Sequence, residues 1–218
     1  MENNLEGNGL RIQPLVVGMV QTNAYVIANE NTKKAVVVDP GADAERILSH
    51  LRSKGLELEA ILLTHGHFDH IMGVNDILDN KRVPVYAYEA EQELLEDASL
   101  NCSVMVGNKT TISNVTYWKD QTSFEVIGYF VKVIATPGHT KGSCCFYFKD
   151  NDVLFSGDTL FMESVGRTDL PTGNSTKIVE SVKSLMEFPD DTIVYPGHGP
   201  ATSISYERTH NPFVNGMA

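Results

Sequence analysis

Apolar and polar positions along the first third of the chain predict a strand, a helix and further strands. AYVIA (24–28) and AVVVDPG (35–41) flank a polar NENTKK turn, which predicts a β-hairpin. The next apolar stripe predicts a helix from an Asp43 cap to about Lys54. EAILLTH (59–65) is short and mostly apolar, as expected of another strand. This succession favours a layered α/β unit.

The rest of the pattern predicts more strands than helices. Residues 98–121 show little period, and two interpretations stay open: an inserted loop beside a site, or an irregular core segment. Four later apolar runs with tight turns predict an antiparallel meander, so we expect two sheets with helices outside. The predicted elements are a strand at 84–88, a helix at 89–97, the runs FEVI, YFVKVIAT, GSCCFYF and DVLFSGD, a helix at 175–188 and a strand at 192–199.

Composition limits the class of protein. The chain has 218 residues, of which 42% are hydrophobic and 21% charged, and shows no linker, so we expect one globular domain over residues 1–218. No run approaches the roughly 18 apolar residues of a membrane span, and the polar MENNLEGNG start does not resemble a secretory signal. Three cysteines, two of them adjacent, fit a reducing compartment, and we expect a cytoplasmic location. A net charge of −11 argues against nucleic acid as a partner.

One short stretch concentrates metal-binding side chains. THGHFDH (64–70) holds His65, His67, Asp69 and His70. On a helix, positions two apart point about 200° apart, so His65 and His67 would not share a face. The stretch follows an apolar strand and contains a glycine, which favours a loop that fans its side chains around a point. Imidazole and carboxylate groups are ligands for zinc, iron or manganese, and four of them in so tight a loop suit two metals better than one.

Three distant residues repeat the same setting. His139, Asp158 and His198 each follow an apolar run that ends in glycine. If these strands run in register, their ends form one rim and the ligands converge there. Two histidines remain: we interpret His50 as a solvated helix residue, while His210 lies in a tail that could fold over the site.

These segments together resemble a known family. VVVDPG, THGHFDH, TPGHTKGS, FSGDTLF and YPGHG, in this order, are similar to the five-part signature of the metallo-β-lactamase superfamily. The resemblance implies a four-layer αββα sandwich with a metal site at one edge of the sheets. It implies two divalent ions, expected to be zinc, with iron or manganese as alternatives. By position, the first ion would be held by His65, His67 and His139, the second by Asp69, His70 and His198, and Asp158 would bridge both.

Details of the sequence favour one branch of that family. Familiar lactamases carry a cysteine where this chain has Asp158, and the flavin-linked diiron members carry glutamate where it has His67, so we expect neither activity. VGRTDLPTGN (165–174) and GHGPATSISYERTHNPF (197–213) resemble the short bacterial glyoxalase II-like enzymes. This implies a thioesterase of the hydroxyacylglutathione hydrolase type, in which a metal-bridged hydroxide attacks a small-molecule thioester and Asp69 orients the water or accepts its proton.

Several assignments stay open at this stage. Asp39 is either a residue that braces the metal loop or a simple turn aspartate. Lys141 is a candidate substrate contact, whereas Arg167 is interpreted as a structural arginine paired with a carboxylate. The GRTD segment also resembles mononuclear iron persulfide dioxygenases, which would use two histidines and one carboxylate, here His65, His139 and Asp158. A non-catalytic metal-binding protein is the last alternative.

Overall fold

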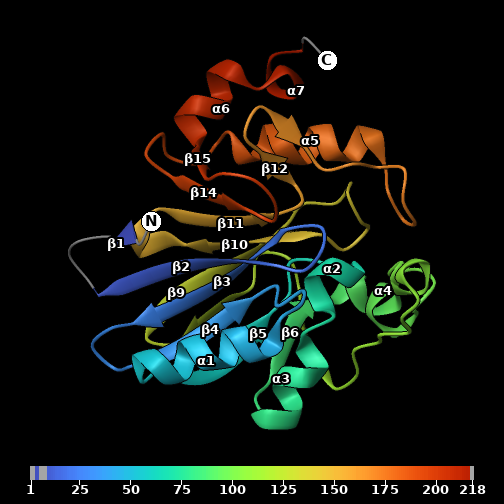
Figure 1. Ribbon diagram of the computed structural model, residues 1–218. Helices are drawn as coiled ribbons and strands as arrows, with labels where there is room; N and C mark the ends of the chain where they lie inside the picture. The colour runs from blue at the N-terminus through green and yellow to red at the C-terminus, as the bar shows by residue number, and fades with distance from the viewer. Residues whose placement is uncertain (1–2, 5–8, 217–218) are drawn as a thin grey trace.

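Two β-sheets pack face to face, and helices cover their outer faces (Figure 1). The structure, a computed structural model, describes residues 3–4 and 9–216. The predicted αββα arrangement is confirmed: α1 and α3 lie outside one sheet, and α5 and α6 outside the other. The prediction made on the MENNLEGNG start lies mostly outside the described residues.

The first sheet contains the predicted hairpin and the strands that follow it. β3 and β4 pair antiparallel, whereas β5, β6 and β7 extend the sheet in parallel. β2 was not predicted, because Pro14 and three other partly or fully exposed positions interrupt its apolar pattern. In the described residues the order is β1 (Asn3–Asn4), β2 (Leu10–Val17), β3 (Thr22–Asn29), β4 (Lys34–Val38), β5 (Glu57–Leu62), β6 (Val85–Tyr88) and β7 (Val115–Trp118).

The second sheet contains the predicted meander. Its four strands pair antiparallel in chain order, and the last predicted strand then joins β11 in parallel. The strands are β8 (Ser123–Val126), β9 (Tyr129–Ala135), β10 (Cys144–Phe148), β11 (Val153–Gly157), β14 (Ile193–Pro196) and β15 (Thr202–Ser203), with a separate pair formed by β12 (Leu160–Phe161) and β13 (Ser164–Val165).

The helices bury one apolar stripe each. α1 buries Ile47, Leu48 and Leu51, as predicted, but Asp43 caps it differently than expected. The Asp43 side chain makes no hydrogen bond to the helix and accepts one from the Gly18 amide at 3.1 Å. The helices are α1 (Ala44–Lys54), α2 (Phe68–Ile71), α3 (Val74–Asn80), α4 (Gln92–Glu96), α5 (Ser175–Leu185), α6 (Ile204–His210) and α7 (Pro212–Asn215), with 3₁₀ turns η1 (Glu89–Glu91), η2 (Ser103–Val106) and η3 (Lys149–Asn151).

The space between the sheets is filled by large apolar side chains. Ile12, Ile27 and Val36 from the first sheet meet Phe146 and Phe155 from the second, and all five are fully buried. Burial of this kind is the main stabilising term in folding. No helix in the described ranges, residues 3–4 and 9–216, is long and apolar enough to cross a membrane.

The segment 98–121 combines both of its open interpretations. Asn101 is fully buried, and its carbonyl accepts a hydrogen bond from the Phe68 amide at 2.8 Å, so the segment holds the start of α2. Its side-chain amide donates to the Thr110 carbonyl at 2.8 Å. Val106 lies at the surface beside Phe68, and the segment ends in the edge strand β7. It is therefore an irregular but anchored segment beside the site.

Candidate metal centre

Four strands bring predicted ligands to one edge of the sandwich, and a fifth, β4, brings Asp39, the possible bracing residue. β4 and β5 run parallel with Val38 opposite Leu62, and β11 and β14 run parallel with Gly157 opposite Pro196. Parallel strands release their following loops at the same edge, where α/β proteins bind ligands. The residues that follow these strand ends are Asp39 after β4, His65 after β5, His139 after β9, Asp158 after β11 and His198 after β14. The expected rim therefore exists.

Three buried histidines form a first group. The Nδ1 atom of His67 lies 2.8 Å from Nε2 of His139, which in turn lies 3.2 Å from Nε2 of His65. Nδ1 of His139 donates to the Arg167 carbonyl at 2.8 Å, so its Nε2 carries a lone pair toward the other rings. Each ring offers one nitrogen to a common point, which is the arrangement of a three-histidine metal site.

Asp69, His70 and His198 form a second group. Nε2 of His198 lies 3.1 Å and Nε2 of His70 3.5 Å from the same carboxylate oxygen, Oδ2 of Asp69. Asp69 and His70 sit on the short helix α2, which was not predicted. Gly41 allows that helix to approach, because a Cβ there would lie 1.4 Å from the Asp69 carbonyl oxygen. These three residues also satisfy the spacing of a metal site.

The loop that carries His198 is fastened to the first sheet. Tyr25 Oη donates to the Pro196 carbonyl at 2.6 Å, and the Asn23 side chain donates to the carbonyls of Pro196 and Gly199 at 3.0 and 2.9 Å. A Cβ at Gly197 would meet Oδ1 of Asp158 at 2.2 Å. The absence of a side chain at this position therefore lets the loop close on the cluster.

Asp158 lies between the two groups. Its Oδ2 is 3.5 Å from Nε2 of His139 and 3.6 Å from Nε2 of His198, and its Oδ1 is 3.4 Å from Nε2 of His70. One carboxylate thus reaches the first group through one oxygen and the second group through both. This is the position expected of a residue that touches two ions at once.

Asp39 contacts one histidine of the second group directly and one of the first through Thr64. Its Oδ2 accepts from Nδ1 of His70 at 3.0 Å and from the Thr64 hydroxyl at 2.5 Å, while Oδ1 accepts from the Thr64 amide at 2.8 Å. The same hydroxyl lies 3.2 Å from Nδ1 of His65. Protons held on both Nδ1 atoms leave both Nε2 atoms free to face the cleft. These contacts support the bracing role over that of a simple turn aspartate.

The two groups differ in charge. Burial lowers the pKa of His65 well below its usual value, and burial together with His139 lowers the pKa of His67 to about 3. Burial alone would raise the pKa of Asp69 and lower that of His70. Their mutual attraction outweighs it, so the pKa of Asp69 falls and that of His70 rises. The first group is therefore neutral imidazole, whereas the second contains an ionised carboxylate.

The donor atoms fit a cation. In the first group, the unprotonated Nε2 atoms of His65 and His139 face each other at 3.2 Å, where two lone pairs repel unless a positive charge lies between them. Among the described residues, Nε2 of His70 and Oδ1 of Asp158 are buried and have no hydrogen-bond partner. Buried polar atoms normally have one, and an ion would supply it.

Two residues that sequence reasoning missed support these groups. Thr22 donates from its hydroxyl to Oδ2 of Asp69 at 3.0 Å. Glu91 is buried and accepts from the Gly66 amide at 2.8 Å and from the Thr140 hydroxyl at 3.0 Å, which ties the loops of the first group together. Burial raises the pKa of Glu91 to about 7. A sequence signal existed for Glu91, because it precedes Leu94 and Leu95 at helical spacing on their buried face.

The remaining predicted residues lie outside the two groups. Arg167 forms a bidentate pair with Asp169, both bonds being 2.7 Å, which confirms its pairing with a carboxylate. Lys141 is exposed and borders a neighbouring hollow with Thr172 and Lys177 rather than the cleft, so its contact with substrate stays a prediction without support. His50 lies half-buried on α1, and His210 stacks on Tyr206, so neither joins the metal-capable groups.

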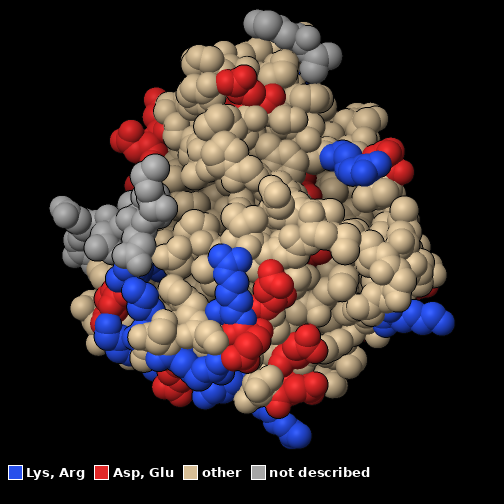
Figure 2. All heavy atoms as spheres, viewed as in Figure 1, with Lys and Arg blue, Asp and Glu red and all other residues tan. Residues whose placement is uncertain are grey.

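A cleft of about 520 Å³ opens onto both groups. His67, His139, Asp158, Asp69 and His198 form its floor, and the rim is formed by Val20, Phe68, Phe161, Ser164, Val165, Arg167 and Leu170. Figure 2 shows that charged side chains gather over α1 in the lower part of this face, while the region between α2 and α5 is largely without them. This surface suits a small, partly apolar molecule better than a polyanion.

Comparison with known proteins identifies the family. The profile described as the metallo-beta-lactamase superfamily matches residues 17–198. The chain belongs to this superfamily. A probable metallo-hydrolase of Bacillus subtilis, YqgX, is 38% identical over 93% of this chain and 96% of its own length. The hydroxyacylglutathione hydrolase GloC of Haemophilus influenzae is 29% identical over 94% and 99%. The chain is therefore a metal-dependent hydrolase of the superfamily.

Solved structures agree on the fold, and one of them is named as a lactamase. A B3 metallo-beta-lactamase, BLEG-1, is 42% identical with a TM-score of 0.89, over 94% of this chain and 100% of that one. TTHA1623 in a di-iron-bound form is 34% identical with a TM-score of 0.83, over 92% and 99%. ETHE1 from Myxococcus xanthus is 30% identical with a TM-score of 0.78, over 94% and 84%. The expectation that this chain is not a lactamase is therefore not supported by its 42% identity to a protein named as one.

Proposed function

We propose that this protein is a thioesterase related to the hydroxyacylglutathione hydrolases, with two divalent ions in one cleft. The observation that carries the proposal is the meeting of two complete three-ligand groups at Asp158. His65, His67 and His139 would hold the first ion, and Asp69, His70 and His198 the second. Zinc is the expected metal, and iron is the first alternative because a 34% identical neighbour holds two irons.

The ions, when bound, lower the pKa of a water molecule and polarise the substrate carbonyl. The protein supplies the remaining parts. Asp39 and the Arg167 carbonyl fix the rings of His70 and His139. Asp69, oriented by Thr22, is placed to accept the proton of the attacking water. A thiolate is a better leaving group than an amine, so this bond breaks more easily in a thioester than in an amide.

The cleft gives little support to glutathione as the thiol. Arg167 is the one Lys or Arg side chain among the described lining residues, and Asp169 already engages its guanidinium. Glutathione carries two carboxylates, which cationic side chains usually hold. We therefore propose the thioester bond as the reacting group and expect low affinity for the glutathione part. The chain's relation to GloC supports the bond cleaved, at 29% identity.

The test offers one metal-loaded preparation several substrates. S-lactoylglutathione and a simple S-acyl thioester are followed by loss of thioester absorbance, and we expect hydrolysis of both, with a higher KM for the first. Elemental analysis should give close to two metals per chain. Absence of thioester cleavage at full metal loading would refute the proposal.

Two competing activities are included because specific similarities favour them. A persulfide dioxygenase, suggested by the GRTD segment at residues 166–169, would use a single iron near His65, His139 and Asp158 and would consume oxygen with glutathione persulfide. A lactamase, suggested by the 42% identical neighbour, would hydrolyse a chromogenic cephalosporin. A non-catalytic metal-binding role would leave all substrates intact, and the open cleft argues against it. Cell fractionation tests the proposed cytoplasmic location.

A further inference from the structure

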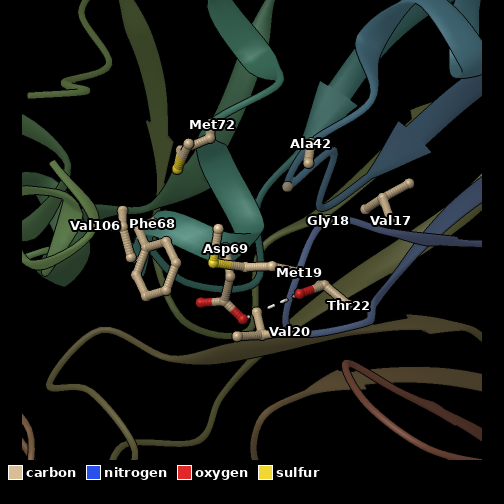
Figure 3. Close-up of a pocket in the computed structure, with 11 residues that line it drawn as sticks. Val17, Gly18, Met19, Val20, Thr22, Ala42, Phe68, Asp69, Met72 and Val106 are labelled. Atoms are coloured by element: carbon tan, nitrogen blue, oxygen red, sulfur yellow. Dashed lines mark hydrogen bonds between the residues drawn. The ribbon is translucent and has the colours of Figure 1, made fainter. Parts of the chain in front are cut away.

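A second, smaller pocket lies beside the metal centre (Figure 3). Phe68 lies on α2 and Met72 directly follows that helix, while Val106 ends η2. Val17 ends β2, and residues 18–20 belong to the loop between β2 and β3. Its volume is about 150 Å³. A cavity of about this size and an apolar lining is known to hold benzene, so the space suits about six carbon atoms.

This pocket adjoins the metal cleft. Val20, Phe68 and Asp69 line both. Asp69 is the one ionisable side chain among the described lining residues of the smaller pocket, and its Oδ2 is turned to Thr22 and His198. A substrate whose carbonyl sits at the metal centre can therefore extend an apolar arm past Phe68 without meeting another charge.

Apolar side chains surround the mouth of the pocket and remain open to solvent. Met19 is 81% exposed, Val20 44%, and Met105, next to Val106, 74%. Grouped exposed apolar side chains usually mark a binding surface. Methionine adapts its shape to different apolar ligands, which suits a pocket mouth.

We propose that this pocket binds the acyl chain of the substrate, and that the preferred thioesters carry an apolar acyl group of about six carbons. The inference rests on the proposed thioesterase function and specifies its substrate class. The inference predicts that thioesters with an apolar acyl group are preferred over lactoyl thioesters, because the lactoyl hydroxyl would enter apolar surroundings. Each methylene buried there adds to binding, so hexanoyl thioesters should exceed acetyl thioesters in kcat/KM by tenfold or more.

The experiment compares S-acyl N-acetylcysteamines with acetyl, butanoyl, hexanoyl and decanoyl chains. Val106→Trp fills the pocket from a partly exposed position, and Val104→Trp is the matched control, because Val104 lies on the same turn but not in the pocket. We expect a maximum near hexanoyl for the wild type and Val104→Trp, and a hexanoyl-to-acetyl ratio near one for Val106→Trp. A flat chain-length profile, or equal profiles for both variants, would overturn the inference.

A second measurement separates this inference from the proposed function. Binding of the non-hydrolysable S-hexyl thioether of N-acetylcysteamine is followed by calorimetry on metal-free protein, and S-methyl thioether is the control ligand. Preferential binding of the hexyl compound, lost in Val106→Trp, supports the pocket even if no thioester is hydrolysed, in which case only the function fails. Equal, weak binding of both compounds refutes the pocket even if thioesters are cleaved.

Discussion

The two metal-capable groups share an edge of the fold but differ in burial and charge. His65, His67 and His139 are each at most 2% exposed, whereas the side chain of Asp69 is 14% and that of His198 28% exposed. The first group is a set of neutral rings, and the second includes an ionised carboxylate whose neighbour His70 is drawn toward its charged form. The first group is thus the more buried of the two, whereas Asp69 and His198 of the second are more open to the cleft that both groups line.

This difference predicts unequal roles. Buried neutral ligands give a rigid site that exchanges slowly with solvent, while partly exposed ligands allow water and substrate to enter. Asp158 connects the two groups, so its loss should affect both, whereas the loss of a single outer ligand should affect one.

Asp69→Asn should have the largest effect. The amide keeps the shape but removes the charge of the second group and the proton acceptor, so we expect kcat to fall roughly a thousandfold. The rate of thioester hydrolysis at full metal loading measures this. Asp76→Asn, an exposed change on α3, is the control. A loss below about tenfold would show that another group accepts the proton.

Asp158→Ala and His198→Ala should differ in metal content. Asp158 approaches both groups at 3.4 to 3.6 Å, so its removal should weaken both ions. His198→Ala should lower the content from about two to about one per chain, because it belongs to the second group alone. Elemental analysis after dialysis gives the counts. Equal losses in the two variants would contradict the bridging position of Asp158.

Glu91→Gln tests what keeps the first group rigid. The folded pKa of about 7 lies above the ordinary 4.5, so the stabilising contribution of Glu91 is full below about pH 4.5 and is lost as the pH rises through 7. The neighbouring thiol of Cys144 and phenol of Tyr117 have raised pKa values and stay neutral throughout. Between these pH values the wild type should lose on the order of 3 kcal/mol of unfolding free energy that Glu91→Gln does not lose.

Urea unfolding of metal-free protein at several pH values measures this difference. Glu93→Gln, an exposed change on α4, which directly follows Glu91, should keep the wild-type slope. Identical pH dependence in all three proteins would mean that Glu91 is ionised without penalty, for example because its three hydrogen-bond donors outweigh burial.

Thr22→Val should have the smallest effect. Valine keeps the volume and removes the hydrogen bond to Asp69, which orients only the second group. A single such bond corresponds to a loss of roughly three- to tenfold in kcat. Thr22→Ser should recover most of the rate, and metal content should stay unchanged. A rate unaltered by Thr22→Val would show that the ligands alone orient Asp69.

The sequence predicted those parts of the fold that depend on local pattern. Strands with continuous apolar runs, such as β11 and β14, and the ligands that follow them were found because each run ends visibly in glycine. β2 was missed because Pro14 hides its alternation, and α2 because it has only four residues. The family resemblance, rather than spacing, divided the ligands between two ions.

Contacts made over long sequence distances were beyond the sequence. Thr22 and Asp69 are 47 residues apart, and nothing near Thr22 distinguishes it from other strand threonines. Helical spacing could have shown Glu91 to be buried, but not its contacts with the Gly66 amide and the Thr140 hydroxyl, which are 25 and 49 residues away. Lys141 is the opposite case. It lies close to His139 in the sequence, but in the structure it borders a hollow other than the metal cleft.

The fastening of the His198 loop to Tyr25 and Asn23 joins residues more than 170 positions apart. A ribosome makes the chain from the N-terminus at about 5–20 residues per second. All three residues of the first group are therefore synthesised several seconds before His198. The two metal positions can therefore form one after the other during synthesis. The more buried position can begin to assemble on the growing chain. The more exposed position is completed only when the His198 loop has met Asn23 and Tyr25.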